Sequence, residues 1–193
     1  MVYQRIWDLA EKYQDKRDDI GHAKTVLEYA IRLLTIVPAD EKIVIPAAIL
    51  HDTGWSQVKK DDWMKIFQDN VASRDKIVIR VKHEKEGAKL ARVILKSVGY
   101  DQNPIERIVE IIDGHDTRGS YLSNEEGVVR DADRLSMFSR WGVEYDLRIR
   151  NLTPEYYLKY LEDKLINRYK FFFEQSRQIA FKELSARKFE YQI

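Results

Sequence analysis

Apolar residues recur at helical spacing along most of this chain, while the strict alternation of a half-buried β-strand is scarce. Four prolines and eight glycines interrupt its 193 residues, so the periodic segments are predicted to be helices joined by short loops. A chain of this length can bury roughly 70% of its unfolded surface in one core. We therefore predict an all-α fold, a single compact helical bundle over residues 1–193 with long helices at its C-terminal end.

The apolar stripes place the individual helices. We expect Asp40 to cap the helix that leads to His51, and Pro46 to kink that helix because it removes one backbone hydrogen bond, unless the helix starts nearer Val44. Residues 55–74 show no clear period and are expected to form a short helix within a loop that could act as a lid, and residues 119–127 a second loop. The helices are expected at about residues 1–13, 20–34, 40–51, 61–68, 77–98 and 104–115, from 130 onward, and as two long helices between 153 and 187.

Composition narrows the chemistry and the partners. The chain has no cysteine, which excludes disulfides, thiolate nucleophiles and cysteine-bound metals. Its 33 basic and 32 acidic residues are interspersed, so we expect neither a nucleic-acid nor a membrane partner. The N-terminus lacks the apolar segment of a signal peptide, and the longest apolar run, residues 43–50, is too short to span a bilayer. The protein is expected to be cytoplasmic.

The four histidines are the strongest functional candidates. Each falls at or near the end of a different predicted helix, and one is directly followed by an aspartate and a nearby glycine, Gly54, that would let the helix stop tightly. Taken singly, such a histidine is more often a hydrogen-bonded core residue. Taken together, they predict a metal site built from nitrogen and oxygen ligands. The histidines are His22, His51, His83 and His115.

The order of these residues carries a family resemblance. His22, then His51-Asp52, then an aspartate in residues 131–133, resembles the H...HD...D signature of the HD superfamily of metal-dependent phosphohydrolases. Residues 21–26, 47–54 and 131–135 are each similar to that superfamily's motif segments. The resemblance covers roughly residues 19–145 and implies an HD-domain-like bundle on which residues 150–193 pack as C-terminal helices. It implies Asp133 as the last ligand, with Asp131 as the alternative.

The additional histidines refine the resemblance. Superfamily members with extra histidines between the doublet and the last aspartate resemble a binuclear type, in which the aspartate of the doublet bridges two ions. By that match His22, His51, Asp52 and Asp133 would hold one ion, and Asp52, His83 and His115 the other. A bridging carboxylate sets two ions about 3.5 to 4 Å apart, close enough to act on one phosphate. Iron is the first expectation, with Mn, Ni, Co and Zn as alternatives, and no organic cofactor is expected.

Residues near the ligands suggest how substrate would be held. Arg118 and Arg134 follow two of the implied ligands closely and are expected to reach a metal-bound phosphate, where a guanidinium can grip two oxygens. The candidate catalytic residues are therefore Asp52, Arg118 and Arg134. Asp116 is expected to hydrogen-bond a ligand histidine, with service as an additional ligand as the alternative. Asp113 and Glu84 are most simply solvated helix residues, although both lie close enough in sequence to the implied ligands to hydrogen-bond near them.

The resemblance implies a hydrolase that cleaves a phosphate ester or anhydride of a nucleotide or another small phosphorylated metabolite. A mixed-valence diiron oxygenase on the same scaffold is the alternative, and a non-catalytic metal or nucleotide sensor is a third. Trp55 stands where the cyclic-dinucleotide phosphodiesterase branch tends to carry lysine, which argues against that branch. The aromatic residues of the C-terminal segment are interpreted first as core and second as a homodimer or ligand surface: Tyr156, Tyr157, Tyr160, Tyr169, Phe171, Phe172 and Phe173.

Overall fold

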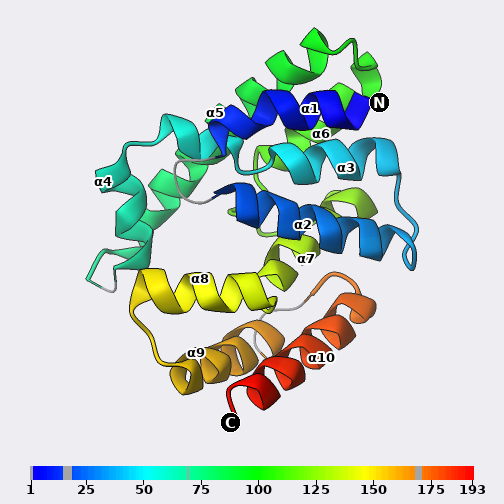
Figure 1. The fold of residues 1–193 in the computed structure, drawn as a ribbon. Coiled ribbons are helices and arrows are strands. Elements are labelled where there is room, and N and C mark those ends of the chain that lie inside the picture. The colour runs from blue at the N-terminus through cyan, green and yellow to red at the C-terminus, as the bar shows by residue number, and fades with distance from the viewer. Residues whose placement is uncertain (1, 15–18, 69, 168–170) are drawn as a thin grey trace.

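Every regular element among the described residues, 2–14, 19–68, 70–167 and 171–193, is helical in this computed structural model, as the sequence predicts (Figure 1). None of the described helices combines the length and apolar character that a bilayer crossing requires. The elements that position the site are α2 (Asp19–Leu34), α3 (Glu41–Leu50), η3 (Thr53–Gln57), α5 (Ser73–Ser97), α6 (Gln102–Ile112) and α7 (Asn124–Ser136).

Helix α3 lies at the centre of the bundle and packs against α1 (Val2–Ala10), α2, α6 and α7 (Figure 1). Its side chains are buried on almost every face, as expected for a helix that is apolar all round. Asp40 caps it by accepting a hydrogen bond from the backbone N–H of Lys42, as predicted. Pro46 lies within the helix and cannot donate to the carbonyl of Lys42, which instead accepts from the hydroxyl of Tyr100 at 2.7 Å.

Helix α5, with 25 residues, is the longest of the described helices and packs against both α6 and the short 3-10 helix η3. Its apolar stripe, which includes Ala88, Ala91 and Leu95, is buried in the same core as Ile105 and Ile108 of α6. The chain leaves α5 through Gly99, whose φ of 73° is a left-handed conformation that glycine adopts without strain. Both helices therefore lie where their apolar periods predict, within a few residues at each end.

Helix α7 begins six residues before the segment from which the sequence predicted it, because Ser123 caps it. The side chain of Ser123 accepts a hydrogen bond from the backbone N–H of Glu126, a Ser-x-x-Glu capping pattern. Gly127, expected in a loop, is thus inside the helix, where Phe172 packs so closely that a Cβ would lie 2.2 Å from its ring. The predicted loop is therefore shorter than expected, and the helix longer.

The C-terminal part forms α8 (Arg140–Arg150), α9 (Pro154–Tyr160), a π-helical turn (Leu161–Ile166) and α10 (Glu174–Glu190). Tyr157 and Phe171 join the main core, whereas Tyr156 is 62% exposed, so the aromatic residues are core only in part. Tyr169 lies outside the described residues. Helix α10 packs on α7 and α9, which ties this segment to the rest of the bundle.

Residues 53–67 fold as three short helices, η3, α4 (Lys60–Trp63) and η4 (Met64–Phe67), rather than one. They close over a small second cluster of buried side chains that is separate from the main core. This cluster contains Trp55, Val58, Trp63 and Ile79. The segment expected as a lid is thus anchored to α5 by its own apolar contacts.

Candidate metal centre

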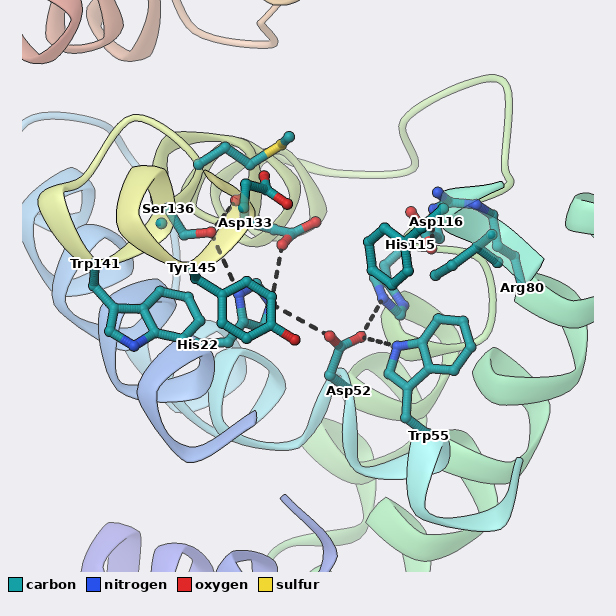
Figure 2. A pocket seen from close by; sticks show the side chains of 15 residues that line it. His22, Asp52, Trp55, Arg80, His115, Asp116, Asp133, Ser136, Trp141 and Tyr145 are labelled. Atoms are coloured by element: carbon teal, nitrogen blue, oxygen red, sulfur yellow. Dashed lines mark hydrogen bonds and ion pairs between the residues drawn. The ribbon is translucent and has the colours of Figure 1, made fainter. Parts of the chain in front are cut away.

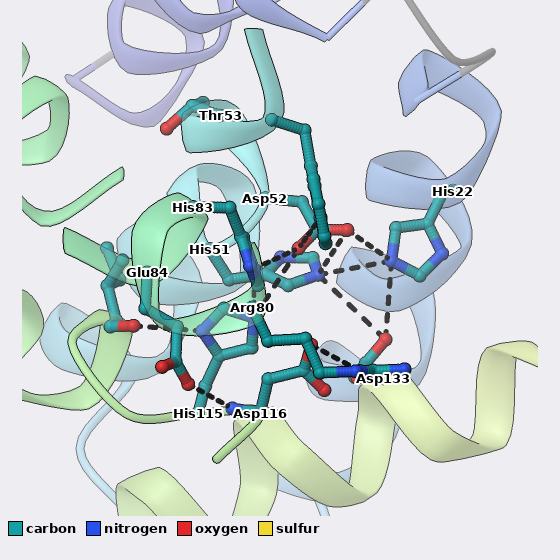
Figure 3. Close-up of polar contacts among 12 residues, drawn as sticks. His22, His51, Asp52, Thr53, Arg80, His83, Glu84, His115, Asp116 and Asp133 are labelled. Atoms are coloured by element: carbon teal, nitrogen blue, oxygen red, sulfur yellow. Dashed lines mark hydrogen bonds and ion pairs between the residues drawn. The ribbon is translucent and has the colours of Figure 1, made fainter. Parts of the chain in front are cut away.

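All four histidines of the chain converge on the aspartate that follows His51 (Figure 3). They reach this point from different elements: His51 and His115 follow helix ends, whereas His83 lies well inside α5 and not near its end as predicted. The six side chains that meet are His22 from α2, His51 and Asp52 at the end of α3, His83 from α5, His115 in the turn after α6, and Asp133 from α7. The structure thus brings together the six side chains that the resemblance implied as first-choice metal ligands.

One half of the cluster gathers around His22. Its Nε2 lies 3.1 Å from Nε2 of His51 and 3.3 Å from Oδ1 of Asp133. The same nitrogen lies 3.3 Å from Oδ2 of Asp52, and Nε2 of His51 lies 3.9 Å from Oδ1 of Asp133. Two imidazole nitrogens and two carboxylates therefore surround one point, and an ion could occupy it.

The other half lies on the opposite side of Asp52. Nε2 of His83 and Nε2 of His115 are 3.4 Å apart, and each lies 3.4 Å from Oδ1 of Asp52. The two carboxylate oxygens of Asp52 therefore face different pairs of histidines. Ligand atoms close enough to share an ion form overlapping groups along the cluster, and one of these groups adds Asp116 to His83 and His115.

The outer ring nitrogens show that two histidines are oriented for ligation. Nδ1 of His51 lies 2.8 Å from the carbonyl of Ala48, and Nδ1 of His115 lies 2.9 Å from the carbonyl of Ile112. A carbonyl only accepts, so each Nδ1 carries a proton and each Nε2 is the ring nitrogen turned toward the cluster. Nitrogen and carboxylate donors in a buried, cysteine-free site suit Fe, Mn, Co, Ni or Zn. The residues present therefore fit a divalent ion.

The charges of the cluster favour cations at its centre. Burial disfavours the imidazolium of His22, but hydrogen bonds and charge from Asp133 and Asp52 outweigh it and raise its pKa to about 10. Burial also lowers the pKa of His115, but the hydrogen bond and charge of Asp52 and the charge of Asp116 outweigh it and raise the pKa to about 9. For Asp133 the balance is reversed. Burial raises the pKa of its carboxyl, but His22 and His51 outweigh this and lower the pKa to about 2. Positive charge is therefore strongly stabilised where an ion would lie.

Of the two aspartates in residues 131–133, the structure places Asp133 in the cluster. The carboxylate of Asp131 instead accepts hydrogen bonds from the backbone N–H groups of Phe172 and Phe173, both at 2.9 Å. Asp131 therefore fastens the segment before α10 to α7. The first implied choice, Asp133, agrees with this geometry, and the alternative does not.

The structure does not place Arg118 or Arg134 beside the cluster, contrary to expectation. Arg118 donates to the carboxylate of Glu126 at 2.9 Å and to the carbonyl of Asp113 at 2.7 Å. Glu126 has no exposed side-chain surface, and a buried carboxylate needs a cationic partner. Arg134 donates to the hydroxyl of Tyr121 at 2.8 Å. Nearness in sequence to a ligand did not predict the direction of either side chain.

Arg80, in contrast, lines the pocket beside the cluster. It lies on α5 three residues before His83, so both side chains project from the same helix face. Its guanidinium donates to Oδ2 of Asp116 at 2.5 Å. The helical spacing from His83 is a signal in the sequence that could have identified it. Asp116 thus binds an arginine rather than a histidine.

Glu84 is buried, not solvated as expected. Its Oε1 accepts the backbone N–H groups of Asp116 and Thr117, both at 2.8 Å, and its Oε2 accepts the hydroxyl of Thr117 at 2.6 Å. These bonds satisfy a buried carboxylate and fix the turn that carries His115. Sequence period could not reveal this role because the partners lie in a non-helical turn.

A pocket of about 200 Å³ opens onto the cluster (Figure 2). Its polar side holds cluster residues with Arg80 and Asp116, and the opposite wall comes mainly from α8 and the preceding turn. Figure 2 shows Trp141 and Tyr145 beside His22, and their rings stack with centroids 5.0 Å apart. The lining residues are His22, Asp52, Trp55, Ile66, Phe67, Arg80, His115, Asp116, Asp133, Ser136, Met137, Trp141, Gly142, Tyr145 and Asp146.

Comparison with known proteins adds a family match. The family model described as HD domain matches residues 19–137. A crystal structure of a predicted HD superfamily hydrolase from an uncultured Thermotogales bacterium is similar, with a TM-score of 0.65 and 21% identity over 98% of this chain and 88% of that chain. At that identity the likeness shows a shared fold. No curated protein matches the chain.

Proposed function

This chain belongs to the HD domain family, and on that premise we propose that it is a metal-dependent phosphohydrolase with two divalent ions. Its substrate class is a phosphate ester or anhydride of a nucleotide or another small phosphorylated metabolite. The structural neighbour is itself named a predicted hydrolase, which agrees with this class. The family match and the donor set of the cluster together support the proposal.

The observation that carries the proposal is the position of Asp52. Its Oδ2 lies 3.3 Å from Nε2 of His22, and its Oδ1 lies 3.4 Å from Nε2 of both His83 and His115. A carboxylate with each oxygen turned to a separate group of imidazoles is suited to bridge two ions. His22, His51 and Asp133 would complete one ion's ligands, and His83 and His115 the other's.

Divalent ions bound there would supply Lewis-acid activation of water and offset the negative charge of a phosphoryl group. The chain's own residues would hold that group in place. Arg80 faces the pocket from the same helix as His83, and its guanidinium can grip two phosphoryl oxygens. Asp116 orients Arg80 through their ion pair. We therefore assign to Arg80 the phosphate-holding role first expected of Arg118 and Arg134.

The lining of the pocket favours a substrate with one phosphoryl group at the cluster and a flat or apolar remainder. Arg80 is the single lysine or arginine among the lining residues, while Asp116 adds negative charge. A long polyphosphate would meet repulsion there. Trp141 and Tyr145 instead offer stacked aromatic rings to the non-phosphate part of a substrate.

The test is phosphate release by protein loaded with iron or manganese, over a panel of phosphorylated metabolites. We expect turnover of at least one phosphomonoester or anhydride, and its loss in His51→Ala, because His51 is fully buried in the cluster with its Nε2 3.1 Å from Nε2 of His22. A fully metallated protein that releases no phosphate from the panel, with His51→Ala identical to it, would contradict the proposal.

The same assay distinguishes hydrolysis from the oxygenase alternative. We expect the manganese-loaded protein to act equally well with and without oxygen, because hydrolysis needs no oxidant. Activity that requires iron and consumes oxygen would replace hydrolysis with oxygenation. Tight binding of a nucleotide without any turnover would instead favour a sensor.

A further inference from the structure

His83 differs from two of the other cluster histidines in what orients its ring. Nδ1 of His51 and Nδ1 of His115 each donate to a backbone carbonyl, at 2.8 and 2.9 Å. The side chain of His83 is fully buried, and its Nδ1 has no hydrogen-bond partner among the described residues. Ligand histidines almost always fix their ring through such an outer hydrogen bond. Something else must therefore hold His83.

The ring of Trp55 lies flat on the ring of His83. Their centroids are 3.9 Å apart and the two planes are inclined by only 8°. Trp55 is 3% exposed and is held in the second apolar cluster with Val58, Trp63 and Ile79. A large ring that is itself fixed by packing restricts the rotation of the imidazole stacked on it.

Trp55 also contacts the central carboxylate. Its indole Nε1 donates to Oδ1 of Asp52 at 3.1 Å, as Figure 2 shows. This is the oxygen that faces His83 and His115, not the one that faces His22. One side chain therefore touches both the imidazole and the carboxylate oxygen of the same half of the cluster.

Gly54 makes this approach possible. A Cβ on Gly54 would lie 1.9 Å from the carbonyl oxygen of His83 and 2.4 Å from the backbone nitrogen of Gly87. The turn that carries Trp55 thus sits directly against α5 at the level of His83. Gly54 was expected to end the helix tightly, but the structure shows that it permits close packing of η3 on α5.

We infer that Trp55 is the positioning residue of the His83 half of the proposed two-ion site. It replaces the missing outer hydrogen bond of His83 by ring stacking and steers Oδ1 of Asp52 by its N–H. The inference rests on the two-ion site of the proposed function. It assigns Trp55 to one ion only, so removing its ring weakens the ion held by His83 and His115 and spares the ion held by His22, His51 and Asp133.

The experiment is a cobalt titration of the metal-free protein, with bound ions counted by elemental analysis. Trp55→Leu removes both the stack and the N–H, whereas Trp55→Phe retains an aromatic ring. Trp63→Phe is the matched control because Trp63 belongs to the same apolar cluster and does not line the pocket. We expect Trp55→Leu to weaken one of two ions by about 10 to 100-fold, and Trp55→Phe to have a smaller effect. Trp63→Phe should bind both ions as the unaltered protein does.

A second measurement needs no metal. In the metal-free protein, an imidazole under an indole ring has carbon-bound protons shifted upfield in the NMR spectrum. We expect the His83 protons, identified by their absence in His83→Gln, to lose this shift in Trp55→Leu and to keep it in Trp63→Phe. This readout stands even if Trp55→Leu is too unstable for titration, because Trp55→Phe should change the shift as well.

The outcomes are distinguishable. Two ions bound equally well by Trp55→Leu and the unaltered protein would overturn the inference and leave the two-ion proposal standing. Equal weakening of both ions, or an unshifted His83 signal in the unaltered protein, would overturn the positioning role of Trp55. A single ion in the unaltered protein would overturn the inference together with the two-ion proposal.

Discussion

Oδ2 of Asp52 lies 3.3 Å from Nε2 of His22, while the other oxygen of the same carboxylate is turned toward His83 and His115. One side chain thus connects the end of α3 to α2 on one side and to α5 and the α6 turn on the other. His51 and Asp52 are adjacent and directly follow the last residue of α3, so the end of this helix presents both side chains to the cluster.

Replacement of Asp52 should therefore abolish tight binding of both ions. We expect Asp52→Ala to bind neither ion tightly, and His83→Ala to lose one ion and retain the other, because the two oxygens of Asp52 face both halves whereas His83 belongs to one half. Elemental analysis of each purified variant after metal loading and desalting measures this. Loss of a single ion from both variants would show that Asp52 does not bridge.

Arg80 should affect substrate turnover and not metal binding. A charge-assisted hydrogen bond contributes about 1.5 to 3 kcal/mol, so Arg80→Ala should reduce kcat/KM by roughly 10 to 100-fold. Arg80→Lys should recover part of this loss because it keeps the charge without the planar fork. The measurement is steady-state kinetics on the best substrate, with ions counted in parallel.

Arg92→Lys is the matched control for Arg80, because Arg92 lies on the same helix but pairs with Glu106 at the surface. It should leave kcat/KM and the ion count unchanged. An Arg80→Ala variant with unaltered kinetics would remove Arg80 from the proposed phosphate site. Loss of ions in that variant would instead give Arg80 a structural role in the cluster.

The contact of η3 with α5 should tolerate no side chain at Gly54. The added Cβ would meet backbone atoms of His83 and Gly87, which cannot move aside as a flexible side chain can. We expect Gly54→Ala to lower the free energy of unfolding by about 1 to 3 kcal/mol, the usual cost of overpacking. Denaturant unfolding measures the change.

Gly119→Ala is the control for Gly54, since a Cβ at Gly119 meets no atom within 4 Å. This variant should unfold at nearly the same denaturant concentration as the unaltered protein. Equal stability of Gly54→Ala and Gly119→Ala would mean that η3 can move away from α5 without cost.

The four histidines could be grouped from the sequence for a physical reason, and the resemblance to the HD superfamily added Asp52 as the bridge and Asp133 as the last ligand. Histidine is scarce in this chain, and helical period alone showed that most histidines continue an apolar stripe to a helix end. Histidines that extend the buried stripes of different packed helices lie on the faces that point into the same core. The all-α fold followed from the same period, and the structure confirms it.

The remaining site residues depend on contacts that no local period records. Glu84 falls on a charged stretch of α5, yet backbone N–H groups of a distant turn bury it. Arg118 is close in sequence to His115 but turns to the buried carboxylate of Glu126. Trp55 gains its proposed role from packing against α5. These contacts join segments far apart in the chain, so they required the three-dimensional structure.

Asp146, on the pocket wall, should make stability depend on pH. Burial raises its pKa, and the hydrogen bond from Tyr157 and the charge of Arg150 only partly offset this. A carboxyl with a raised pKa in the folded state contributes fully to stability below its ordinary pKa of about 4, and that contribution is lost as pH rises through the folded value.

Asn keeps an oxygen for Tyr157 but cannot ionise. Asp146→Asn should therefore gain stability relative to the unaltered protein between pH 4 and 7, measured by denaturant unfolding, whereas exposed Asp163→Asn should not. Parallel pH curves for the Asp146→Asn variant and the unaltered protein would show that Asp146 ionises in the folded protein without cost.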